Sequence, residues 1–424
     1  MKRLSFLLAA VLASSASAAE LTRVASSFEE KDPFGMYLNF TFDRTGDRGT
    51  ITREWYQLGQ LQDVTELRYQ KYDTRLGIDV NLGIYKDLEL HIGVPIVFQQ
   101  DRNWFFAGGT NETNSTIGRN CGDASGSPCA NPGSGTDQLF GLPPYPGGIN
   151  SYRSGLGDFT FGLAWNAFNQ AKDPSKPTWT LRFDYTAPTA QLLNPSVPTS
   201  SGTRGNIGDK LHRYTFSTAV SRRISKYVEP YFELHYTLAW RGPGAYSNCD
   251  DPSAERMGNP QNCGKTGWER SETGIKPVHT GGTQFGVEIT AFEREDRHQK
   301  VTFDFRGFVN YFSEGRYYNE MSDLFGKLLY TSDYGQAGGQ FGFVGQAAEF
   351  VILKAYTSFA YNSEHFLTNE NIGKDLNGNG TVDITTNPEE INPNYDFRID
   401  RVGRRFRLEQ NFIFKIMVTA TFNF

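Results

Sequence analysis

Residues 228–241 read Val-Glu-Pro-Tyr-Phe-Glu-Leu-His-Tyr-Thr-Leu-Ala-Trp-Arg, and apolar and polar side chains alternate along the stretch. One face holds Phe232, Leu234, Tyr236, Leu238 and Trp240. The opposite face holds Glu229, Tyr231, Glu233, His235, Thr237 and Arg241. Successive side chains of a β-strand point to opposite faces, so the pattern predicts a strand with one apolar and one polar face.

The same alternation recurs along the chain, most clearly in residues 75–84, 178–186 and 301–311. Read in this way, the sequence predicts twelve strands, at about 33–43, 64–84, 88–100, 156–168, 178–188, 211–223, 228–241, 280–292, 300–312, 336–349, 351–364 and 412–424. A soluble β-sandwich has the same alternation, so strand pattern alone does not decide between the two architectures.

The lengths of the connections between strands distinguish a soluble β-sandwich from a transmembrane barrel. Short connections are expected at 85–87, 169–177, 224–227, 293–299 and near Phe350, and long polar ones at 44–63, 101–155, 189–210, 242–279, 313–335 and 365–411. Compact soluble domains do not carry so many long structureless connections. Short turns on one side and long loops on the other predict an all-β transmembrane barrel, antiparallel and up-and-down, with twelve strands within a range of ten to fourteen. Its short turns would be periplasmic and its long loops extracellular.

Composition excludes several other classes. The chain has 424 residues, with 33 Phe, 21 Tyr, 42 Lys and Arg, 47 Asp and Glu, and a net charge of -5. A helical membrane protein would need several apolar runs of about 20 residues. So many aromatic residues argue against disorder, and the negative charge without a basic block argues against a nucleic-acid partner.

The first residues have the features of an export signal. Lys2 and Arg3 precede the apolar run 4–12, and Ala16-Ser17-Ala18 has the small-residue pattern of a cleavage site. We therefore expect residues 1–18 to be a signal peptide and the mature chain to start at Ala19. Residues 19–32 are expected to form an N-terminal periplasmic segment, and 33–424 a single barrel in the bacterial outer membrane.

The C-terminal strand supports the same architecture. Its apolar stripe consists of Phe412, Phe414, Ile416, Val418, Ala420, Phe422 and Phe424. A barrel in lipid leaves no open edge, so this strand should pair with the first. A terminal strand ending in Phe also resembles the signal by which barrel-assembly machinery recognises its clients, which makes that machinery an expected partner. Trp179, Tyr185, Tyr236, Trp240, Tyr311 and Tyr361 lie toward strand ends, as in aromatic girdles.

The four cysteines form two local pairs, Cys121/Cys129 and Cys249/Cys263, each in Gly-, Pro- and Asn-rich sequence. Four cysteines allow three connectivities. The two local disulfides are favoured, because each would close a short loop within one polar segment of an exported protein. A metal site is the alternative.

The inward faces of the predicted strands are rich in charged residues. The candidate lumen-lining residues are Arg75, Asp79, Glu89, His91, Asp158, Arg182, Asp184, Arg213, Glu229, Glu233, His235, Glu288, Asp304, Arg306 and Lys354, together with Lys415. One interpretation is a polar pore whose charges act on solutes. The other is a network of cross-strand ion pairs that fills and braces the lumen. Because both signs of charge are present, strong ion selectivity is not expected.

Two outer loops carry further candidates. Loop 101–155 starts with the aromatic run 104–106, which suggests either a constriction folded into the mouth or an exposed, disulfide-closed lid. In loop 365–411, residues 375–383 match the first nine positions of a calcium loop. The candidate ligands are Asp375, Asn377, Asn379, Thr381 and Asp383.

The calcium motif is incomplete. Its twelfth position is Thr386 rather than Glu, and Glu389 or Glu390 could complete the ligand set. An ordinary Asn/Gly turn is the alternative. Motifs of envelope enzymes are absent from the sequence, and the predicted alternation places His212 and Ser217 on opposite faces, so we expect no enzymatic activity.

Several short segments resemble a known family. They are Leu82-Gly-Ile-Tyr-Lys-Asp-Leu-Glu-Leu90 with Gly93-Val-Pro95, Gly155-Leu-Gly-Asp158, Tyr185-Thr-Ala-Pro-Thr189 and Tyr227-Val-Glu-Pro-Tyr231. Together they resemble outer-membrane proteins of the "meta-pathway of phenol degradation" type, over about half of the chain. The long outer loops and the calcium-like segment depart from that family. The resemblance implies a barrel for uptake of small compounds, apolar or aromatic ones among them.

The sequence thus leads to two hypotheses about function. The first is a monomeric outer-membrane channel, in contact with lipid, for passive passage of small solutes, with no cofactor other than a candidate structural calcium. The second is a structural or interaction barrel with a plugged lumen, whose outer loops bind a surface polymer or an envelope partner. A lumen closed by Arg182, Asp184, Asp304 and Arg306 would favour the second.

Overall fold

The structure, a computed structural model, describes residues 19–26, 35–57, 59–111, 115–117, 149–253, 256–348 and 350–424. Its strands are β1 (Met36–Gln57), β2 (Gln60–Tyr85), β3 (Leu88–Phe106), β4 (Ile149–Leu156), β5 (Phe159–Phe168), β6 (Thr178–Ala187), β7 (Leu211–Ser221), β8 (Val228–Arg241), β9 (Thr280–Arg294), β10 (Gln299–Phe312), β11 (Gly315–Tyr317), β12 (Leu329–Thr331), β13 (Tyr334–Ala348), β14 (Val351–Asn362), β15 (His365–Phe366) and β16 (Phe406–Asn423). Its helices are short: α1 (Arg270–Thr273), α2 (Ser322–Phe325) and five 3-10 turns, η1 (Glu20–Thr22), η2 (Asn248–Asp250), η3 (Pro260–Asn262), η4 (Glu295–Arg297) and η5 (Pro388–Glu390).

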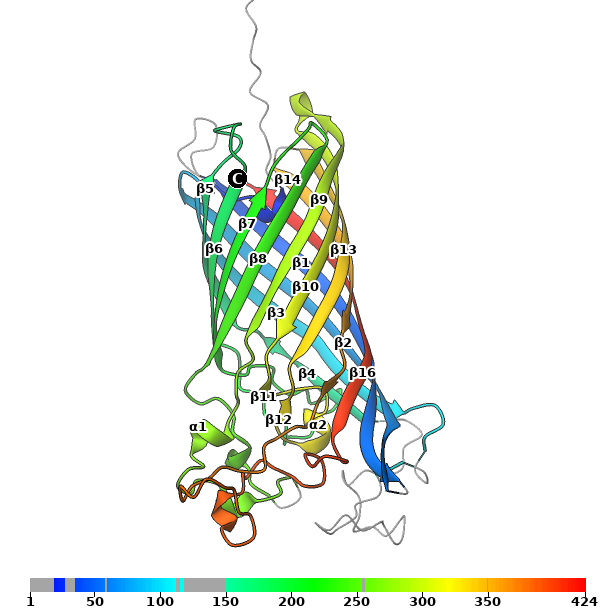
Figure 1. Cartoon of the computed structure of the whole chain (residues 1–424). Coiled ribbons are helices and arrows are strands. Elements are labelled where there is room, and N and C mark those ends of the chain that lie inside the picture. Colours follow the sequence, from blue (N-terminus) through cyan, green and yellow to red (C-terminus); the bar gives the residue numbers. More distant parts are fainter. Residues whose placement is uncertain are drawn as a thin grey trace, which may run out of the picture.

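The long strands form one closed antiparallel barrel (Figure 1). Neighbours follow the order β1-β2-β3-β5-β6-β7-β8-β9-β10-β13-β14-β16, and β16 pairs with β1, so twelve of the described strands complete the ring. On the side away from β2, the neighbour of β3 consists of two strands. β5 pairs with the first half of β3, residues 88–93, and β4 pairs with its second half, residues 96–104. The predicted all-β, twelve-stranded, up-and-down barrel is confirmed.

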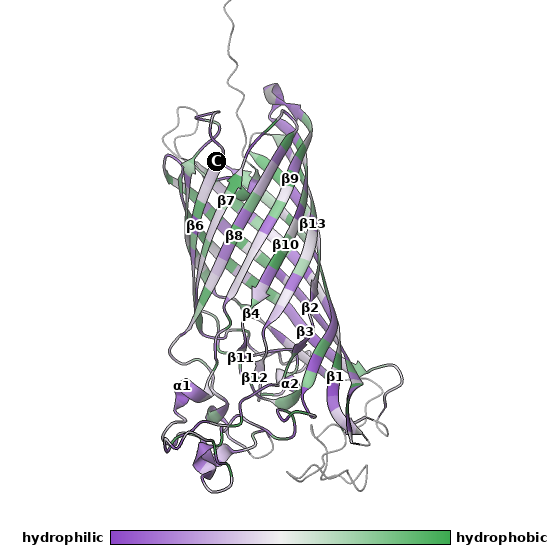
Figure 2. Ribbon diagram, viewed as in Figure 1, coloured by the Kyte–Doolittle hydropathy of each residue, from purple (hydrophilic) through white to green (hydrophobic). Residues whose placement is uncertain are grey.

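The outer wall of the barrel is apolar. Figure 2 shows hydrophobic and hydrophilic residues alternating along the strands. Exposed aromatic and aliphatic side chains on this wall include Phe40, Phe42, Phe161, Leu163, Phe216, Phe232, Leu234, Phe285, Phe305, Phe341, Leu353, Phe359, Phe412, Phe414 and Ile416. A closed barrel with an apolar outer band is the structure of an integral outer-membrane protein. Within the part of the chain that the structure describes, no helix is long and apolar enough to cross a membrane.

Short turns lie at the end of the barrel where the C-terminus is found, and long connections gather at the other end (Figure 1). The prediction of a long loop at residues 44–63 is wrong. The described residues of 44–63 belong almost entirely to β1 and β2, which remain paired from Met36↔Leu82 to Gln57↔Gln60. Sequence alternation weakens there because the strands leave the apolar zone, whereas the ladder of backbone hydrogen bonds does not depend on an apolar face. For the same reason β16 starts at Phe406 rather than near 412.

The outer mouth of the barrel contains a hydrophobic core. It joins inward-facing residues of β1, β2, β3 and β16 to residues around α2 and to three outer-loop residues: Ile51, Leu67, Tyr69, Trp104, Ile117, Met321, Leu324, Phe325, Leu329, Leu367, Ile399, Phe406 and Leu408. The Trp104 indole donates to the Glu320 carbonyl at 3.0 Å, and Arg153 pairs with Asp323 at 2.6 Å. The segment around α2 is therefore packed inside the mouth. We call this segment, with the outer loops 242–279 and 363–405, the outer cap.

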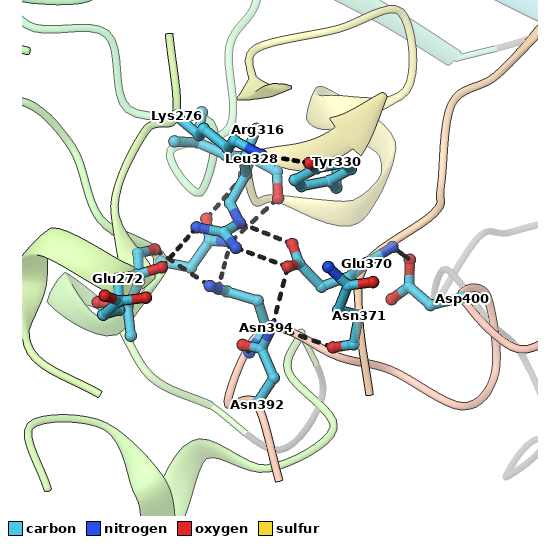
Figure 3. A network of polar contacts seen from close by, with 12 residues as sticks. Glu272, Lys276, Arg316, Leu328, Tyr330, Glu370, Asn371, Asn392, Asn394 and Asp400 are labelled. Carbon is cyan, nitrogen blue, oxygen red and sulfur yellow. Dashed lines mark hydrogen bonds and ion pairs between the residues drawn. The ribbon is translucent and has the colours of Figure 1, made fainter. Parts of the chain in front are cut away.

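A buried ion pair joins the three loops of the outer cap (Figure 3). The Arg316 guanidinium donates to both carboxylate oxygens of Glu370, at 2.7 and 2.6 Å. It also donates to the carbonyls of Glu272 and Gly274, each at 2.8 Å. Bidentate pairs of this kind fix geometry as well as charge, so one arginine holds the loops in a defined arrangement.

A disulfide joins Cys249 to Cys263 within the cap, as one of the two local pairs predicted. The other pair, Cys121 and Cys129, lies outside the described residues.

Replacing Cys249 and Cys263 with Ser should loosen the cap without opening the barrel. The disulfide closes a loop with a sequence separation of 14, for which chain entropy predicts about 3 kcal/mol of stabilisation. We expect faster proteolysis between 242 and 279 and an unchanged heat-dependent shift on SDS gels. Equal proteolysis of the variant and the wild type would contradict this role.

A second prediction concerns pH. Burial of the Asp400 carboxyl raises its pKa to about 7, although the backbone amides of Glu370 and Asp396 donate to its oxygens at 3.0 and 2.9 Å. An Asp in an unfolded chain titrates near 3.9. The folded cap therefore binds the proton more tightly, and its stability should fall as pH rises from about 4 to about 7.

Hydrogen-exchange protection factors of residues 396–400 would measure this loss. The Asp400→Asn variant, which has no titrating group at this position, should show a flatter pH dependence. The same dependence in both proteins would exclude Asp400 as the cause.

Candidate functional site

The barrel encloses a polar cavity of about 570 Å³. Its wall includes the charged residues Glu20, Arg23, Asp79, Glu89, His91, Arg182, Asp184, Glu233, His235, Arg306 and Lys354, with hydroxyl, amide and a few apolar side chains between them. Carboxylates, basic groups and neutral polar groups thus face one space, which suits a small polar or charged solute better than a hydrocarbon.

In the structure, the predicted lumen residues fall into three groups that differ in what they contact. Nine of them line the cavity: Asp79, Glu89, His91, Arg182, Asp184, Glu233, His235, Arg306 and Lys354. Glu229, Glu288 and Asp304 are buried in contacts with the chain itself. Arg75, Asp158 and Arg213 form ion pairs outside the cavity lining, Arg75 with Asp43 at 3.0 Å and Arg213 with Asp158 at 3.7 Å. Lys415 lies 3.8 Å from the same Asp43.

Several charged side chains on the wall have polar partners on the same or on other strands. Arg306 donates to Asp304 at 2.9 Å, to the Tyr231 hydroxyl at 3.0 Å and to the Gln284 amide oxygen at 3.1 Å. His91 lies 3.1 Å from Asp184. Mutual contacts among Arg182, Asp184, Asp304 and Arg306 would have indicated a closed lumen. These four residues do not form one network, because Arg182 lines the cavity and Asp184 pairs with His91.

The His91–Asp184 pair depends on a glycine. His91 on β3 and Asp184 on β6 both lie opposite Gly162 of β5, which separates these two strands. A Cβ at residue 162 would come within 2.0 Å of the Asp184 carboxylate and 2.6 Å of the His91 ring. Glycine leaves the space in which the two side chains meet over an intervening strand.

The N-terminal segment lies inside the lumen. Sequence analysis placed residues 19–32 in the periplasm, but the described part, Ala19–Ser26, crosses the periplasmic end of the barrel interior. The backbone nitrogens of Ala19, Glu20 and Ala25 donate to the carboxylates of Glu229, Glu288 and Glu89, each at 2.6 Å. The Thr180 hydroxyl donates to the Thr22 carbonyl at 3.1 Å.

The side chain of Glu20 strengthens this attachment, because it forms ion pairs with Lys354 and, at 3.2 Å, with Arg23. Inward glutamates of β3, β8 and β9 thus act as acceptors for a peptide that the chain itself supplies. We call Ala19–Ser26 the lumen segment.

Sequence reasoning missed both segments that enter the barrel, the lumen segment and the segment around α2. Nothing in residues 19–26 marks them as a lumen segment, because their binding partners come from several strands that are distant in sequence. The α2 segment did have a signal, since Met321, Leu324, Phe325, Leu328 and Leu329 form an apolar group within a loop predicted to be polar. Such a group in a loop is expected to be buried.

The aromatic run at 104–106 belongs to β3 and not to a loop. Trp104 is almost fully buried and packs against Tyr69 in the core of the mouth. These residues are therefore not part of a lid, because the outer part of β3 continues as a strand paired with β2. Most of the rest of loop 101–155, residues 118–148, lies outside the described residues.

The residues considered for catalysis have other contacts. The His212 ring lies 2.7 Å from the Tyr185 hydroxyl and stacks on that ring. Ser217 lines the cavity and lies opposite His235 in the β7–β8 pairing.

The calcium-like segment is an exposed turn of the cap. Asp375 accepts from the amides of Gly378 and Gly380, both at 2.7 Å, and the Gly380 amide lowers the pKa of this carboxyl. Glu390 is fully buried and accepts from the amides of Leu376 and Asp383 at 3.3 and 2.9 Å. No group of three or more His, Cys, Asp or Glu side chains suited to a metal occurs among the described residues. Calcium binding stays a prediction.

A calcium titration tests it. If the loop binds calcium, a concentration one hundred times the Kd should stabilise the cap by about 2.7 kcal/mol, seen as slower proteolysis between 375 and 383. Magnesium at the same concentration and the Asp375→Asn variant serve as controls. Equal proteolysis with and without calcium would leave an ordinary Asn/Gly turn.

Comparisons with known proteins give distant likenesses. No protein-family model matches the chain, and no curated protein matches its sequence. Among solved structures, an outer-membrane channel from Pseudomonas putida F1 is similar, with 9% identity, a TM-score of 0.43, and coverage of 95% of this chain and 96% of that one.

Two further structures show the breadth of the likeness. The P. putida toluene transporter TodX has 9% identity and a TM-score of 0.32, covering 92% of this chain and 90% of its own. The outer-membrane protease OmpT from Escherichia coli has 7% identity and a TM-score of 0.28, covering 92% and 96%. Transporters and a protease both appear, and at these values the likeness carries no inference about function.

Proposed function

We propose that the protein is an outer-membrane channel for small polar or charged solutes, closed at its periplasmic end by the lumen segment. The polar cavity carries this proposal. A barrel serving only as a scaffold could fill its interior with side chains, as eight-stranded barrels do. Here a space of about 570 Å³ remains beside the ion pairs, and its wall offers donors and acceptors of both signs.

The solute class follows from the lining. Arg182 and Lys354 can bind anionic groups, and Asp79 and Glu233 cationic ones, so zwitterionic solutes fit the wall best. An apolar compound would have to displace water from these groups without replacing its hydrogen bonds, which is unfavourable. The apolar solutes that the family resemblance suggests are therefore the less favoured class for passage along the lumen.

The proposal also includes the oligomeric state of the protein and the way in which it enters the membrane. We propose passive passage through a monomer, inserted by the barrel-assembly machinery through β16 and the terminal residue Phe424. No catalytic step is part of the proposal.

Conductance in a planar bilayer tests the channel directly. Wild-type protein should be closed for most of the time with brief openings, and a variant lacking Glu20–Ser26 should show longer openings of larger conductance, because the lumen segment no longer occupies the pore. The balance of charges on the wall predicts a reversal potential near zero in a potassium chloride gradient. Heat-dependent mobility on SDS gels would establish that both proteins are folded.

Liposome swelling provides the solute arm of this test. Small zwitterions should enter faster through the deletion variant than through the wild type. If both proteins are folded, silent and impermeable, the channel proposal is wrong.

A second function is favoured by one observation, the ordered outer cap. Three loops joined by the Arg316–Glu370 pair and by a disulfide present a defined outer surface. We propose binding of a surface polymer or envelope partner by this cap as the alternative, which a silent barrel in both assays would support.

A further inference from the structure

The lumen segment begins at a buried nitrogen. Ala19 is fully buried, and its backbone nitrogen donates to Oε1 of Glu229 at 2.6 Å. The Ser221 hydroxyl donates to the same oxygen at 2.7 Å. Glu229 itself is 6% exposed. Its carboxylate is therefore held in the wall of the barrel by contacts that include the backbone of the lumen segment.

The sequence independently marks Ala19. The Ala16-Ser17-Ala18 pattern predicts that signal-peptide cleavage leaves Ala19 as the first residue of the mature chain. Its nitrogen is then an α-amino group rather than a peptide nitrogen. We propose that this α-ammonium group forms a buried ion pair with Glu229, so that removal of the signal peptide creates the charge that anchors the lumen segment.

The physical reason is the difference between the two forms of the nitrogen. In the precursor it is a neutral amide with one hydrogen, and Ser221 is also a neutral donor. In the mature chain it carries a positive charge and three hydrogens. A buried carboxylate without a charged partner is costly, and a charge-assisted hydrogen bond is about twice as strong as a neutral one.

The local geometry holds the nitrogen in place before any charge is considered. The Thr22 amide donates to the Ala19 carbonyl at 2.9 Å and closes the turn η1. The Thr22 hydroxyl lies 2.7 Å from that of Ser221. Ala19 is thereby fixed beside Glu229 at both its nitrogen and its carbonyl, which reduces the entropy lost when the ion pair forms.

The chain offers a matched control. Glu288 accepts from the Glu20 nitrogen at 2.6 Å, the same distance as in the Ala19–Glu229 contact. Glu288 is 7% exposed, so its burial is also similar. The Glu20 nitrogen remains an amide after cleavage, so only Glu229 should respond to the state of residue 19.

The first measurement is the rate at which a small acylating reagent modifies the N-terminus of the folded mature protein near neutral pH, read by mass spectrometry. Intact mass also shows whether the chain starts at Ala19. We expect acylation at least about tenfold slower than in the unfolded chain, the size of effect expected for a hydrogen bond to a charged group. Glu229→Gln should recover most of this rate, and Glu288→Gln much less.

The second measurement separates the ion pair from an ordinary backbone contact. A Gly inserted between Ala18 and Ala19 keeps the cleavage pattern but moves the amino group one residue away and makes the Ala19 nitrogen an amide. In this background Glu229→Gln should have little further effect on the acylation rate. Glu288→Gln should have the same effect with and without the insertion, because distant groups act additively.

Each outcome decides the proposal without requiring a conducting channel. Coupling of the insertion to Glu229→Gln but not to Glu288→Gln supports it. A mature chain that starts at another residue, an N-terminus acylated as fast as in the unfolded chain, or equal coupling to both glutamates would overturn it. If Glu229→Gln fails to fold, the acylation rate of the folded wild type and the identity of its first residue still test the proposal, because neither measurement needs a variant.

Discussion

The structure depends on the closure of the sheet between its first and last strands. Lipid offers no hydrogen-bond partners, so every strand edge must be paired inside the protein. β1 and β16 meet this requirement over their length, from Tyr37↔Asn423 to Arg53↔Phe406. At the periplasmic end, Met36 and Phe424 exchange backbone hydrogen bonds of 3.1 and 2.9 Å. Closure also directs every inward side chain into one shared space, and this creates the cavity.

Closure brings together carboxylates that lie far apart in the sequence. Glu89, Glu229 and Glu288 project from three different strands into the periplasmic end of the lumen, where burial makes an unpaired carboxylate costly. The lumen segment supplies donors for all three. The same contacts therefore satisfy these buried carboxylates and hold the lumen segment at the periplasmic end of the barrel, where we propose that it closes the channel.

The contacts at the outer end of the barrel are of a different kind. There the barrel extends beyond the membrane, and its inner face becomes apolar at Ile51, Leu67, Trp104 and Phe406. The α2 segment fills this space by hydrophobic packing, and the Arg316–Glu370 pair joins the loops around it. Apolar packing at one end and hydrogen-bonded carboxylates at the other leave the polar cavity between them.

The sequence by itself determined the class of fold, the number of strands and the alternation of apolar and polar residues along them, and it favoured the Cys249–Cys263 disulfide. These follow from a period of two and from short-range spacing, which are local properties of the chain. It did not determine where β1 and β2 end, because paired strands outside lipid need no apolar face. The tertiary structure alone decided the position of Ala19 beside Glu229, the meeting of His91 with Asp184 over Gly162, and the entry of α2 into the mouth. Each of these contacts joins residues from separate strands or loops, and only the closed barrel brings them within bonding distance.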